Sequence, residues 1–328
     1  MRKIVSAFAL LASGVLLSMC GAQAQEPYPS RPITMVVAFP PGGVADLTAR
    51  PIAVPLERIL KQKIVIENRT GAGGGIGNAY VARARPDGYT LLMALSSISI
   101  LPEADKVNGR TPSYTLDQFV PIALVSSDPT VLVVRGESAV KTVKDLVDYA
   151  KANPGKLNYS SSGLYSALHT PMEMLAIATD MRMFHVPYQG GGPAVAALLG
   201  GQVEALASGP GPVIPHIKAG KLRPLATWGA RRHPSLPDVP TLKELGIDCE
   251  FYIWAGLFVP AATPEPVVRR LRDAVREAVQ DAQFRTAMEG AGQPIDYRDA
   301  PDFRTFWEAD AKKMAEIVKK IGRVEEKK

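Results

Sequence analysis

Cysteine and histidine, the residues on which disulfide frameworks and many metal centres depend, are scarce in this chain. Its 328 residues include two cysteines and four histidines. We expect the N-terminal segment that contains Cys20 to be removed, and Cys249 alone then rules out a disulfide within the mature chain. The histidines lack the spacing of metal ligands. We therefore expect no metal, no cofactor and a Cys249 thiol buried beside its apolar neighbours.

Long apolar runs are missing after residue 19. The one long run, Ile4–Met19, follows two basic residues and precedes Ala22-Gln23-Ala24, a small-x-small cleavage sequence. This pattern predicts a secretory signal peptide, residues 1–24, that is cleaved after Ala24. No later stretch approaches the ~20 apolar residues that a membrane-spanning helix needs. We expect the mature chain to be soluble and exported to the periplasm.

Clusters of charge of one sign are absent as well. The net charge is +6, and it falls to +4 when the signal peptide with its two basic residues is removed. Without a basic stripe, nucleic acid is not an expected partner. A modest positive charge suits a small anionic ligand, although a solvated surface gives the same number. The length is sufficient for two domains with their own cores.

The stretch 33–94 repeats one pattern twice. The apolar run Ile33–Phe39 breaks at Pro40-Pro41-Gly42-Gly43, and a helical pattern follows; Lys63–Glu67 breaks at Thr70–Gly77 before a second helix. A third apolar run, Tyr89–Ala94, completes a pattern typical of a parallel sheet with crossover helices. Glycine-rich loops at strand carboxyl ends bring backbone N–H groups and helix N-termini close to a ligand. The two loops therefore predict an anion-binding site.

The middle of the chain repeats this pattern, with small-residue loops at Ser160–Gly163 and Gly190–Gly192. We expect an irregular stretch at 95–114, a helix capped by Thr142, and three helices near 266–280, 282–289 and 301–321. The predicted fold class is α/β, with two domains that are each a mostly parallel sheet flanked by helices. Domain one is expected to comprise residues 25–125 plus 253–328, and domain two residues 126–252. Strands that cross near 122–134 and 248–258 would form the hinge.

Motifs of known enzyme classes are incomplete. Thr70–Gly77 matches the T-G-x-x-x-G-I-G pattern of short-chain dehydrogenases, but none of the ten tyrosines has lysine four positions on. The motif also lies in the second strand–helix loop, whereas a dinucleotide fingerprint belongs in the first. There is no G-x-S-x-G nucleophile elbow. A serine hydrolase built on Ser160–Ser162 and His169 is the remaining enzyme alternative, and we expect a binding protein rather than an enzyme.

Ten segments, in order along the chain, form one set: Arg31–Ile33, Phe39–Gly43 with Asp46 and Arg50, Glu67–Arg69, Gly71–Gly77, Pro86–Tyr89, Ser160–His169, Val186–Pro193, Gly200–Val203, Lys218–Arg223 and Leu236–Thr241. This set resembles one known family, the periplasmic solute receptors of tripartite tricarboxylate transporters (the Bug or TctC family). The resemblance covers nearly the whole mature chain.

This resemblance implies a type II-like periplasmic binding protein whose two domains close on an organic acid in the cleft between them. It implies that one carboxylate is bound by Phe39, Pro41, Gly42 and Gly43 together with Gly73, Gly74 and Gly75. It implies that Ser160, Ser161 and Ser166 meet the distal end of the ligand. Further candidate ligand-binding residues are Asp46, Ser96, Ser97, Tyr165, His169, Tyr188 and Ser208.

Two departures from the family pattern affect the ligand. Tyr165 follows Leu164 where relatives have a small residue, and its ring could narrow the pocket, stack on an aromatic ligand or point outward. Ser208 stands where relatives that bind amino acids have an acidic residue, which argues against an α-amino ligand. We also expect Gly42→Val to abolish binding by crowding the first loop.

The predicted function is capture of an organic acid, either a dicarboxylate or an aromatic carboxylate, by a monomeric solute-binding protein. The resemblance implies that the ligand-bound form docks on the membrane subunits of a tripartite tricarboxylate transporter. The alternatives are a carboxylate receptor that signals to a sensor kinase and, third, the secreted serine hydrolase.

Overall fold

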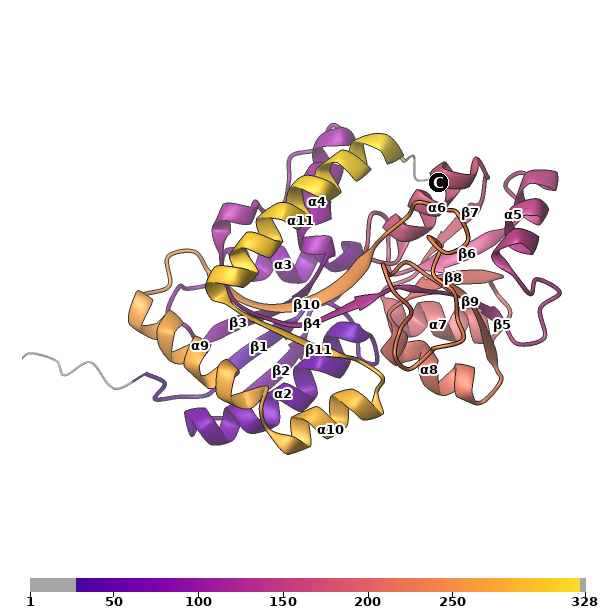
Figure 1. Ribbon diagram of the computed structural model, residues 1–328. Helices are drawn as coiled ribbons and strands as arrows, with labels where there is room; N and C mark the ends of the chain where they lie inside the picture. The colour runs from indigo at the N-terminus through magenta and orange to yellow at the C-terminus, as the bar shows by residue number, and fades with distance from the viewer. Residues whose placement is uncertain (1–27, 325–328) are drawn as a thin grey trace, which may run out of the picture.

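The computed structural model describes residues 28–324, which form two lobes side by side along one long axis (Figure 1). The expected signal peptide lies outside the described residues. Within residues 28–324, no helix combines the length and the apolar character required to cross a membrane.

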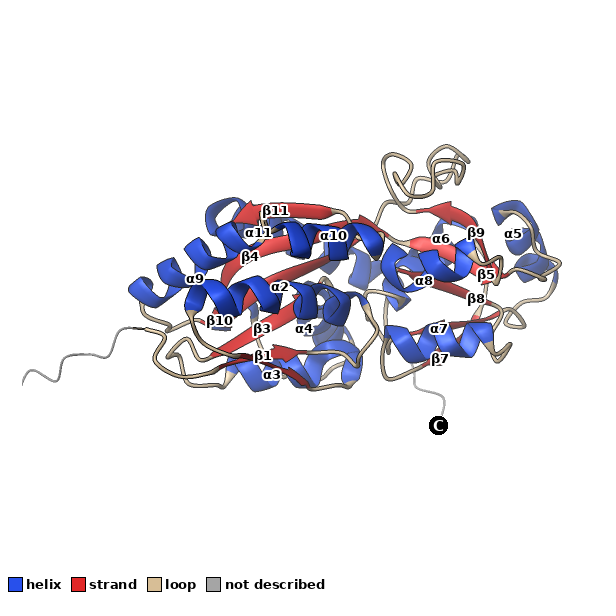
Figure 2. Ribbon diagram, turned by 90° about the horizontal axis from the view of Figure 1, so that it is seen from below, coloured by secondary structure: helices blue, strands red, loops and turns tan. Residues whose placement is uncertain are grey.

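The larger lobe, called the first lobe here, is built on a six-stranded sheet in the order β11-β4-β10-β3-β1-β2. Helices α2, α9 and α10 pack on one face, and α3, α4 and α11 cover the other (Figures 1 and 2). Its strands are β1 (Ile33–Val37), β2 (Ile64–Asn68), β3 (Thr90–Leu95), β4 (Phe119–Pro129), β10 (Tyr252–Pro260) and β11 (Ile295–Asp299). Its helices are α2 (Val44–Leu60), α3 (Gly75–Ala82), α4 (Ser97–Val107), α9 (Glu265–Ala278), α10 (Ala282–Gly290) and α11 (Ala300–Ile321), with 3-10 turns η1 (Ala72–Gly74) and η2 (Leu116–Gln118).

The smaller lobe, called the second lobe, is built on a five-stranded sheet in the order β7-β6-β8-β5-β9. Helices α7 and α8 lie on one face and α6 on the other (Figure 1). The strands are β5 (Val131–Arg135), β6 (Asn158–Ser161), β7 (Phe184–Pro187), β8 (Ala205–Ser208) and β9 (Leu222–Thr227). The helices are α5 (Val143–Ala152), α6 (His169–Thr179), α7 (Gly191–Leu199) and α8 (Pro210–Lys218).

Strand β1 fixes the geometry of the first lobe. It lies between β2 and β3 and pairs with both in parallel, Ile33 opposite Ile64 and Thr34 opposite Thr90. A strand with neighbours on both sides and helices on both faces is buried throughout, which explains its continuous apolar run. Because parallel strands end at the same sheet edge, the loops after β1 and β2 lie together, facing the second lobe.

The α/β class and the two helix-flanked sheets are confirmed, and both sheets are mixed: four strands of each run in one direction and the remaining strands run against them. In the first sheet, β10 pairs in an antiparallel manner with β3 and β4, and β11 with β4. In the second sheet, β5 is antiparallel to β8 and β9. The physical reason is the crossing: β4 carries the chain out of the first lobe and β10 brings it back, so the two run in opposite directions side by side.

Several local expectations are corrected by the structure. The stretch expected to be irregular contains α4, although Pro102 lies within it, and β11 and α8 were not expected. Helix α2 runs without interruption over 17 residues that include Pro51 and Pro55. The Thr142 cap of α5 is confirmed, since the Thr142 side chain accepts a hydrogen bond from the Asp145 N–H.

The only free cysteine among the described residues is Cys249, and it is buried as expected. Burial is the main reason that the pKa of its thiol is raised to about 11. The thiolate is therefore scarce at neutral pH, and the residue packs as a small apolar side chain.

Candidate functional site

The loop after β1 is held in place by a buried carboxylate. Asp46, in the first turn of α2, accepts hydrogen bonds from the Gly42 N–H at 3.1 Å and the Arg50 Nε at 2.9 Å. Asn68 at the end of β2 donates to the Phe39 carbonyl at 2.8 Å and to Asp46 at 3.2 Å. All of these contacts lie within the first lobe. Asp46 thus positions the loop instead of facing a ligand.

The space around Gly42 is more open than we expected. It has a φ of +82°, and a Cβ added there would find nothing within 4 Å. The expectation that Gly42→Val crowds the loop is therefore wrong. Any effect of that substitution comes from backbone strain, because a β-branched residue is disfavoured at positive φ.

The loop after β2 requires glycine both for its positive φ angles and for close packing. Gly71, Gly73 and Gly74 all have positive φ. A Cβ on Gly74 would lie 2.7 Å from Cζ of Phe39, so the Phe39 ring covers this loop. A Cβ on Gly77 would lie 2.7 Å from the Ala38 Cα, which shows how closely α3 approaches β1.

Two loops of the second lobe meet these loops across the cleft. A Cβ on Gly190 would lie 2.3 Å from the Pro40 ring, and one on Gly192 would lie 2.9 Å from the Pro41 carbonyl oxygen. On the other side, a Cβ on Gly163 would lie 3.0 Å from the Gly73 nitrogen. The lobes therefore touch through backbone, and glycine is what allows them to close this far.

Two cavities lie between the lobes. The larger, about 520 Å³, is bounded by the loop after β2, the end of α4 and the residues after it, the serine loop and the loop after β7. The smaller, about 10 Å³, lies between the start of α2 and the starts of α7 and α8. Ser162 lines both. Only the larger cavity has the volume for an organic acid.

The predicted site residues divide into those that line a cavity and those that support it. Gly73, Gly75, Tyr165 and Tyr188 line the larger cavity, and Phe39, Gly43 and Ser208 line the smaller. The remaining predicted residues line neither cavity; they are Pro41, Gly42, Asp46, Gly74, Ser96, Ser97, Ser160, Ser161, Ser166 and His169.

Three of the predicted serines, Ser160, Ser161 and Ser166, have hydroxyl groups that are bonded within the second lobe itself. Ser160 Oγ donates to the Ala194 carbonyl at 3.0 Å, and Ser161 Oγ lies 2.6 Å from His185 Nε2. Ser166 Oγ accepts the His169 N–H at 3.2 Å. Ser162, which was not among the predicted residues, is buried, and its hydroxyl has no partner among the described residues. Within the serine loop, it is the residue that both lines the cavities and has a hydroxyl available to a ligand.

Histidines form the support behind the serine loop. His169 and His185 are in edge contact, with ring centroids 4.4 Å apart. Burial lowers the pKa of His185 to about 4. The pKa of His169 lies well below its ordinary value, mainly because of burial and secondly because of the charge of His185. Both rings are therefore neutral at pH 7. The suggested pairing of the serine loop with His169 is wrong, because His169 Nδ1 accepts the Tyr165 N–H at 3.2 Å.

Tyr165 joins the two lobes. Its hydroxyl donates to the Gly322 carbonyl at 2.7 Å and accepts from the Asn108 side chain and the Val324 N–H, both at 3.0 Å. These partners lie at the C-terminal ends of α4 and α11 in the first lobe. Lys313 on α11 adds a fourth hydrogen bond between the lobes, since its Nζ donates to the Glu250 carbonyl at 3.1 Å. Of the three orientations expected for the Tyr165 ring, the structure has the one that narrows the cavity.

Arg110 was missed by sequence reasoning because it follows α4 in a loop without a motif. Its Nε donates to Asp105 at 3.0 Å. It is the only basic residue, and Asp105 the only acidic one, among the described residues that line the two cavities between the lobes. Apart from this pair, the lining offers amides, hydroxyls and apolar groups.

Two α/β lobes, joined by crossing strands and facing each other through loops around a cavity, define a periplasmic-binding-protein fold of two lobes. A family model described as "Tripartite tricarboxylate transporter family receptor" (TctC) matches residues 48–323. The chain belongs to this family.

Relatives extend over almost the whole chain. Protein BugT of Bordetella pertussis is 33% identical over 320 residues, covering 94% of this chain and 96% of BugT. A UPF0065 protein of Cupriavidus necator is 36% identical over 307 residues, covering 93% and 92%. The structure of the periplasmic binding protein BugD matches with a TM-score of 0.84 and 34% identity, covering 90% of this chain and 98% of BugD.

A fourth relative is described with its ligand. MatC from Rhodopseudomonas palustris, with bound malate, matches with a TM-score of 0.84 and 30% identity, covering 89% of this chain and all of MatC. The family and these structures are of periplasmic solute-binding proteins, which confirms the expectation of a binding protein rather than an enzyme and implies export to the periplasm.

Proposed function

We propose that this protein captures an organic dicarboxylate between its lobes and delivers it to the membrane subunits of a tripartite transporter. The observation that carries the proposal is the cavity of about 520 Å³ between the lobes, lined by the glycine loop after β2 and by Ser162. Two uncapped helix N-termini meet at the smaller cavity, which shares Ser162 with the larger one. The N-cap residues of α2 and α7, Gly43 and Gly190, supply no side-chain cap. A Cβ on Gly43 would lie 3.9 Å from the Gly191 nitrogen. Both ends carry partial positive charge, so an anion beside them favours the closed form.

Ser162 and the loop after β2 extend this site into the larger cavity. The Ser162 hydroxyl can donate to a carboxylate oxygen, as can the backbone N–H groups of Ala72 and Gly73; those of Gly74 and Gly75 already donate to the Gly71 and Ala72 carbonyls. A carboxylate bound there touches both lobes, so it binds the closed form more tightly than the open form and drives closure. Main-chain amides thus keep the anion-binding role expected from the sequence, and Ser162 takes the role first predicted for Ser160, Ser161 and Ser166.

Arg110 favours a dicarboxylate over an aromatic monocarboxylate. Its guanidinium engages Asp105 through Nε only, which leaves the terminal nitrogens for a second carboxylate. An aromatic monocarboxylate would leave that cation without a ligand partner. The relatives described with malate and with adipate are consistent with this choice.

The lobes described above suggest how the chain divides. We propose domains of residues 25–125 plus 253–328 and of residues 126–252, with the hinge in β4 and β10, and cleavage of the signal peptide after Ala24. A monomer is sufficient for this function, because all the groups invoked come from one chain.

Calorimetric titration tests the ligand class, with adipate, malate and the matched monocarboxylate hexanoate as probes. We expect adipate to bind at least about tenfold more tightly than hexanoate, because one charge-assisted contact is lost in hexanoate. In Arg110→Gln this difference should disappear while hexanoate affinity is retained. Equal binding of adipate and hexanoate to the unaltered protein would contradict the dicarboxylate assignment, and no binding of any organic acid in a wider screen would contradict carboxylate capture itself.

The transport role requires a second measurement. Deletion of the gene should abolish high-affinity uptake of the radiolabelled acid identified by calorimetry, and expression of the protein should restore it. Normal uptake in the deletion strain, together with a lost transcriptional response to the acid, would instead support the signalling alternative.

A further inference from the structure

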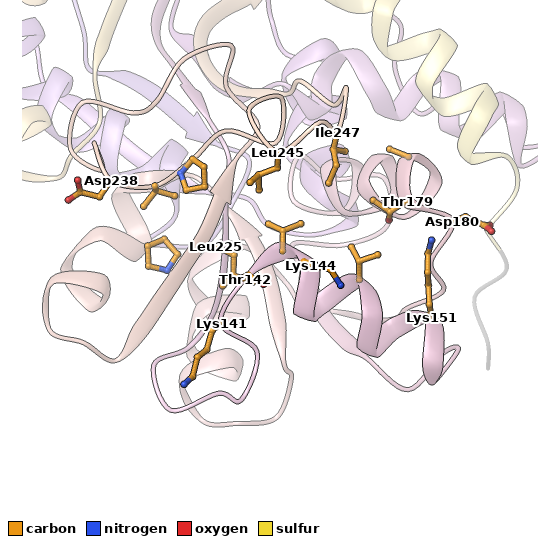
Figure 3. Close-up of a pocket in the computed structure, with 16 residues that line it drawn as sticks. Lys141, Thr142, Lys144, Lys151, Thr179, Asp180, Leu225, Asp238, Leu245 and Ile247 are labelled. Atoms are coloured by element: carbon orange, nitrogen blue, oxygen red, sulfur yellow. The ribbon is translucent and has the colours of Figure 1, made fainter.

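A groove of about 810 Å³ lies on the second lobe, away from the cleft between the lobes (Figure 3). All its lining residues fall within 141–247, and none of them lines either cavity between the lobes. Neither the fold nor the proposed function accounts for it. Its volume is within the range of sites that bind organic molecules of drug size.

The lining of the groove is mainly apolar. Helix α5 supplies Val147, and strand β9 supplies Leu225. Leu245 and Ile247 face them from the opposite wall (Figure 3). Leu245 is 46% exposed, so the apolar surface is open to solvent in this form of the protein.

The opposite wall belongs to a long segment, residues 228–251, that has neither helix nor strand. It is nevertheless held in place: Thr227 pairs with Thr241, and Arg232 forms an ion pair with Glu244 at 2.9 Å. Ordered loops longer than ~12–15 residues without secondary structure are uncommon and usually functional. Ordering so long a segment costs conformational entropy, which suggests that the wall serves to bind a ligand.

Lysines give the groove its charge. Lys141, Lys144 and Lys151 line it against Asp180 and Asp238, an excess of one positive charge. Figure 3 shows Lys144 and Lys151 on the α5 side, with the two aspartates near opposite ends. Lys144 is paired with Asp148, whereas Lys141 and Lys151 form no ion pair within the described part of the chain. An anionic head group therefore finds partners along α5.

We infer that this groove is a second binding site, for an amphipathic organic anion with a hydrocarbon or aryl body. The carboxylate or sulfonate lies beside Lys141, just before α5, or beside Lys151 in its last turn, and the body lies against Val147, Leu225 and Leu245. Apolar burial supplies most of the affinity, and the ammonium groups select the sign of the charge. The site is independent of carboxylate capture between the lobes, so either can fail without the other.

The test uses the full mature chain and 8-anilinonaphthalene-1-sulfonate, an aryl sulfonate whose fluorescence rises in apolar surroundings. We expect saturable one-site binding that dodecanoate displaces and dodecyltrimethylammonium, with the same chain and opposite charge, does not. Lys141→Glu combined with Lys151→Glu should weaken binding about tenfold. Leu245→Asp places a charge in the apolar wall and should weaken it at least as much. Both changes are at exposed positions, so the fold is retained.

Lys218→Glu, an exposed change on α8 outside the groove, is the matched control and should leave the affinity unchanged. Adipate at saturating concentration should not displace the fluorophore, which separates this site from the one between the lobes. The inference is overturned if the groove variants bind as the unaltered protein does, or if adipate or the cationic detergent displaces the probe.

Discussion

The two lobes approach the same cavity with different chemical groups. The first lobe presents backbone, on glycine loops that Asp46 and Asn68 hold from behind, and one cationic side chain, that of Arg110. The second lobe presents glycines of its own, the free hydroxyl of Ser162 and the ring of Tyr165, supported by a neutral pair of histidines. Backbone amides bind any carboxylate, so the difference teaches that choice among carboxylates must come from the second lobe and from Arg110.

The largest expected effect comes from blocking contact between the lobes. Gly192 lies within α7 at negative φ, so alanine or valine is compatible with the local backbone, but a Cβ there would lie 2.9 Å from the Pro41 oxygen of the first lobe. Gly192→Val should therefore hold the lobes apart and lower adipate affinity at least about 100-fold, because only the closed fraction binds.

Gly191→Ala is the matched control for this change. A Cβ there would have no neighbour nearer than 3.7 Å, which is ordinary contact. Calorimetry should find its affinity within about threefold of the unaltered protein, since such a contact costs little. Small-angle scattering of Gly192→Val with adipate should match the open form; a compact, ligand-bound Gly192→Val protein would contradict closure through this contact.

The next effect tests the first lobe, in which Asp46 holds the loop after β1. Asp46→Asn removes the negative charge that accepts hydrogen bonds from the Gly42 N–H and from Arg50. The buried amide that replaces the carboxylate is a weaker acceptor for both donors. We expect a loss of about 2 kcal/mol in ligand binding, roughly 30-fold. Glu67→Gln, which breaks the exposed ion pair with Arg69, serves as control and should change little. Equal effects of the two changes, measured by calorimetry, would argue against a positioning role for Asp46.

Tyr165→Phe tests the connection that the second lobe makes to the first. The change removes three hydrogen bonds to the ends of α4 and α11 while it retains the ring in the cavity. Water replaces these bonds when the lobes open, so we expect a net loss of about 1.5 kcal/mol, roughly tenfold in affinity. Tyr188→Phe is a close control, because its hydroxyl bonds only to Gln202 in the same lobe. Unchanged affinity in Tyr165→Phe would mean that its hydroxyl does not stabilise the closed form.

The smallest effect concerns pH and the histidine support. Burial lowers the pKa of His185 from 6.5 to about 4, so the unfolded chain takes up a proton at a higher pH than the folded chain does. Stability is therefore complete above pH 6.5 and falls as the pH drops from 6.5 to 4. His185 is partly open to solvent, so its share is about 1 kcal/mol. Denaturant unfolding at pH 7 and pH 4.5 should show a smaller difference for His185→Gln than for the unaltered protein or His216→Gln; equal differences would exclude His185 as a cause.

Much of the first lobe could be predicted from sequence, because local pattern determines it. The apolar runs ending at Phe39 and Glu67 predict buried strands, and parallel strands bring their following loops to one edge. The direction of β10 is not a local property: it follows from where the chain returns from the second lobe. The pattern of Ser97–Val107 was also ambiguous, since serines and Pro102 within it are poor helix signals.

The part of the site that the second lobe contributes could be predicted only incompletely. The serine loop was recognised, but which hydroxyl is free depends on partners distant in sequence, such as Ala194 for Ser160 and His185 for Ser161. The partners of the Tyr165 hydroxyl include Gly322 and Val324, more than 150 residues away. No periodicity or motif encodes such contacts.

A crystal structure of the protein with adipate tests the central claim most directly. That claim is that amides of the glycine loops, together with Ser162, bind the anion as the lobes close. We predict one carboxylate within hydrogen-bond distance of Ser162 Oγ and of the backbone N–H of Ala72 or Gly73, and the other beside Arg110. Adipate bound outside the cavities between the lobes, or bound there through a metal ion, would contradict it.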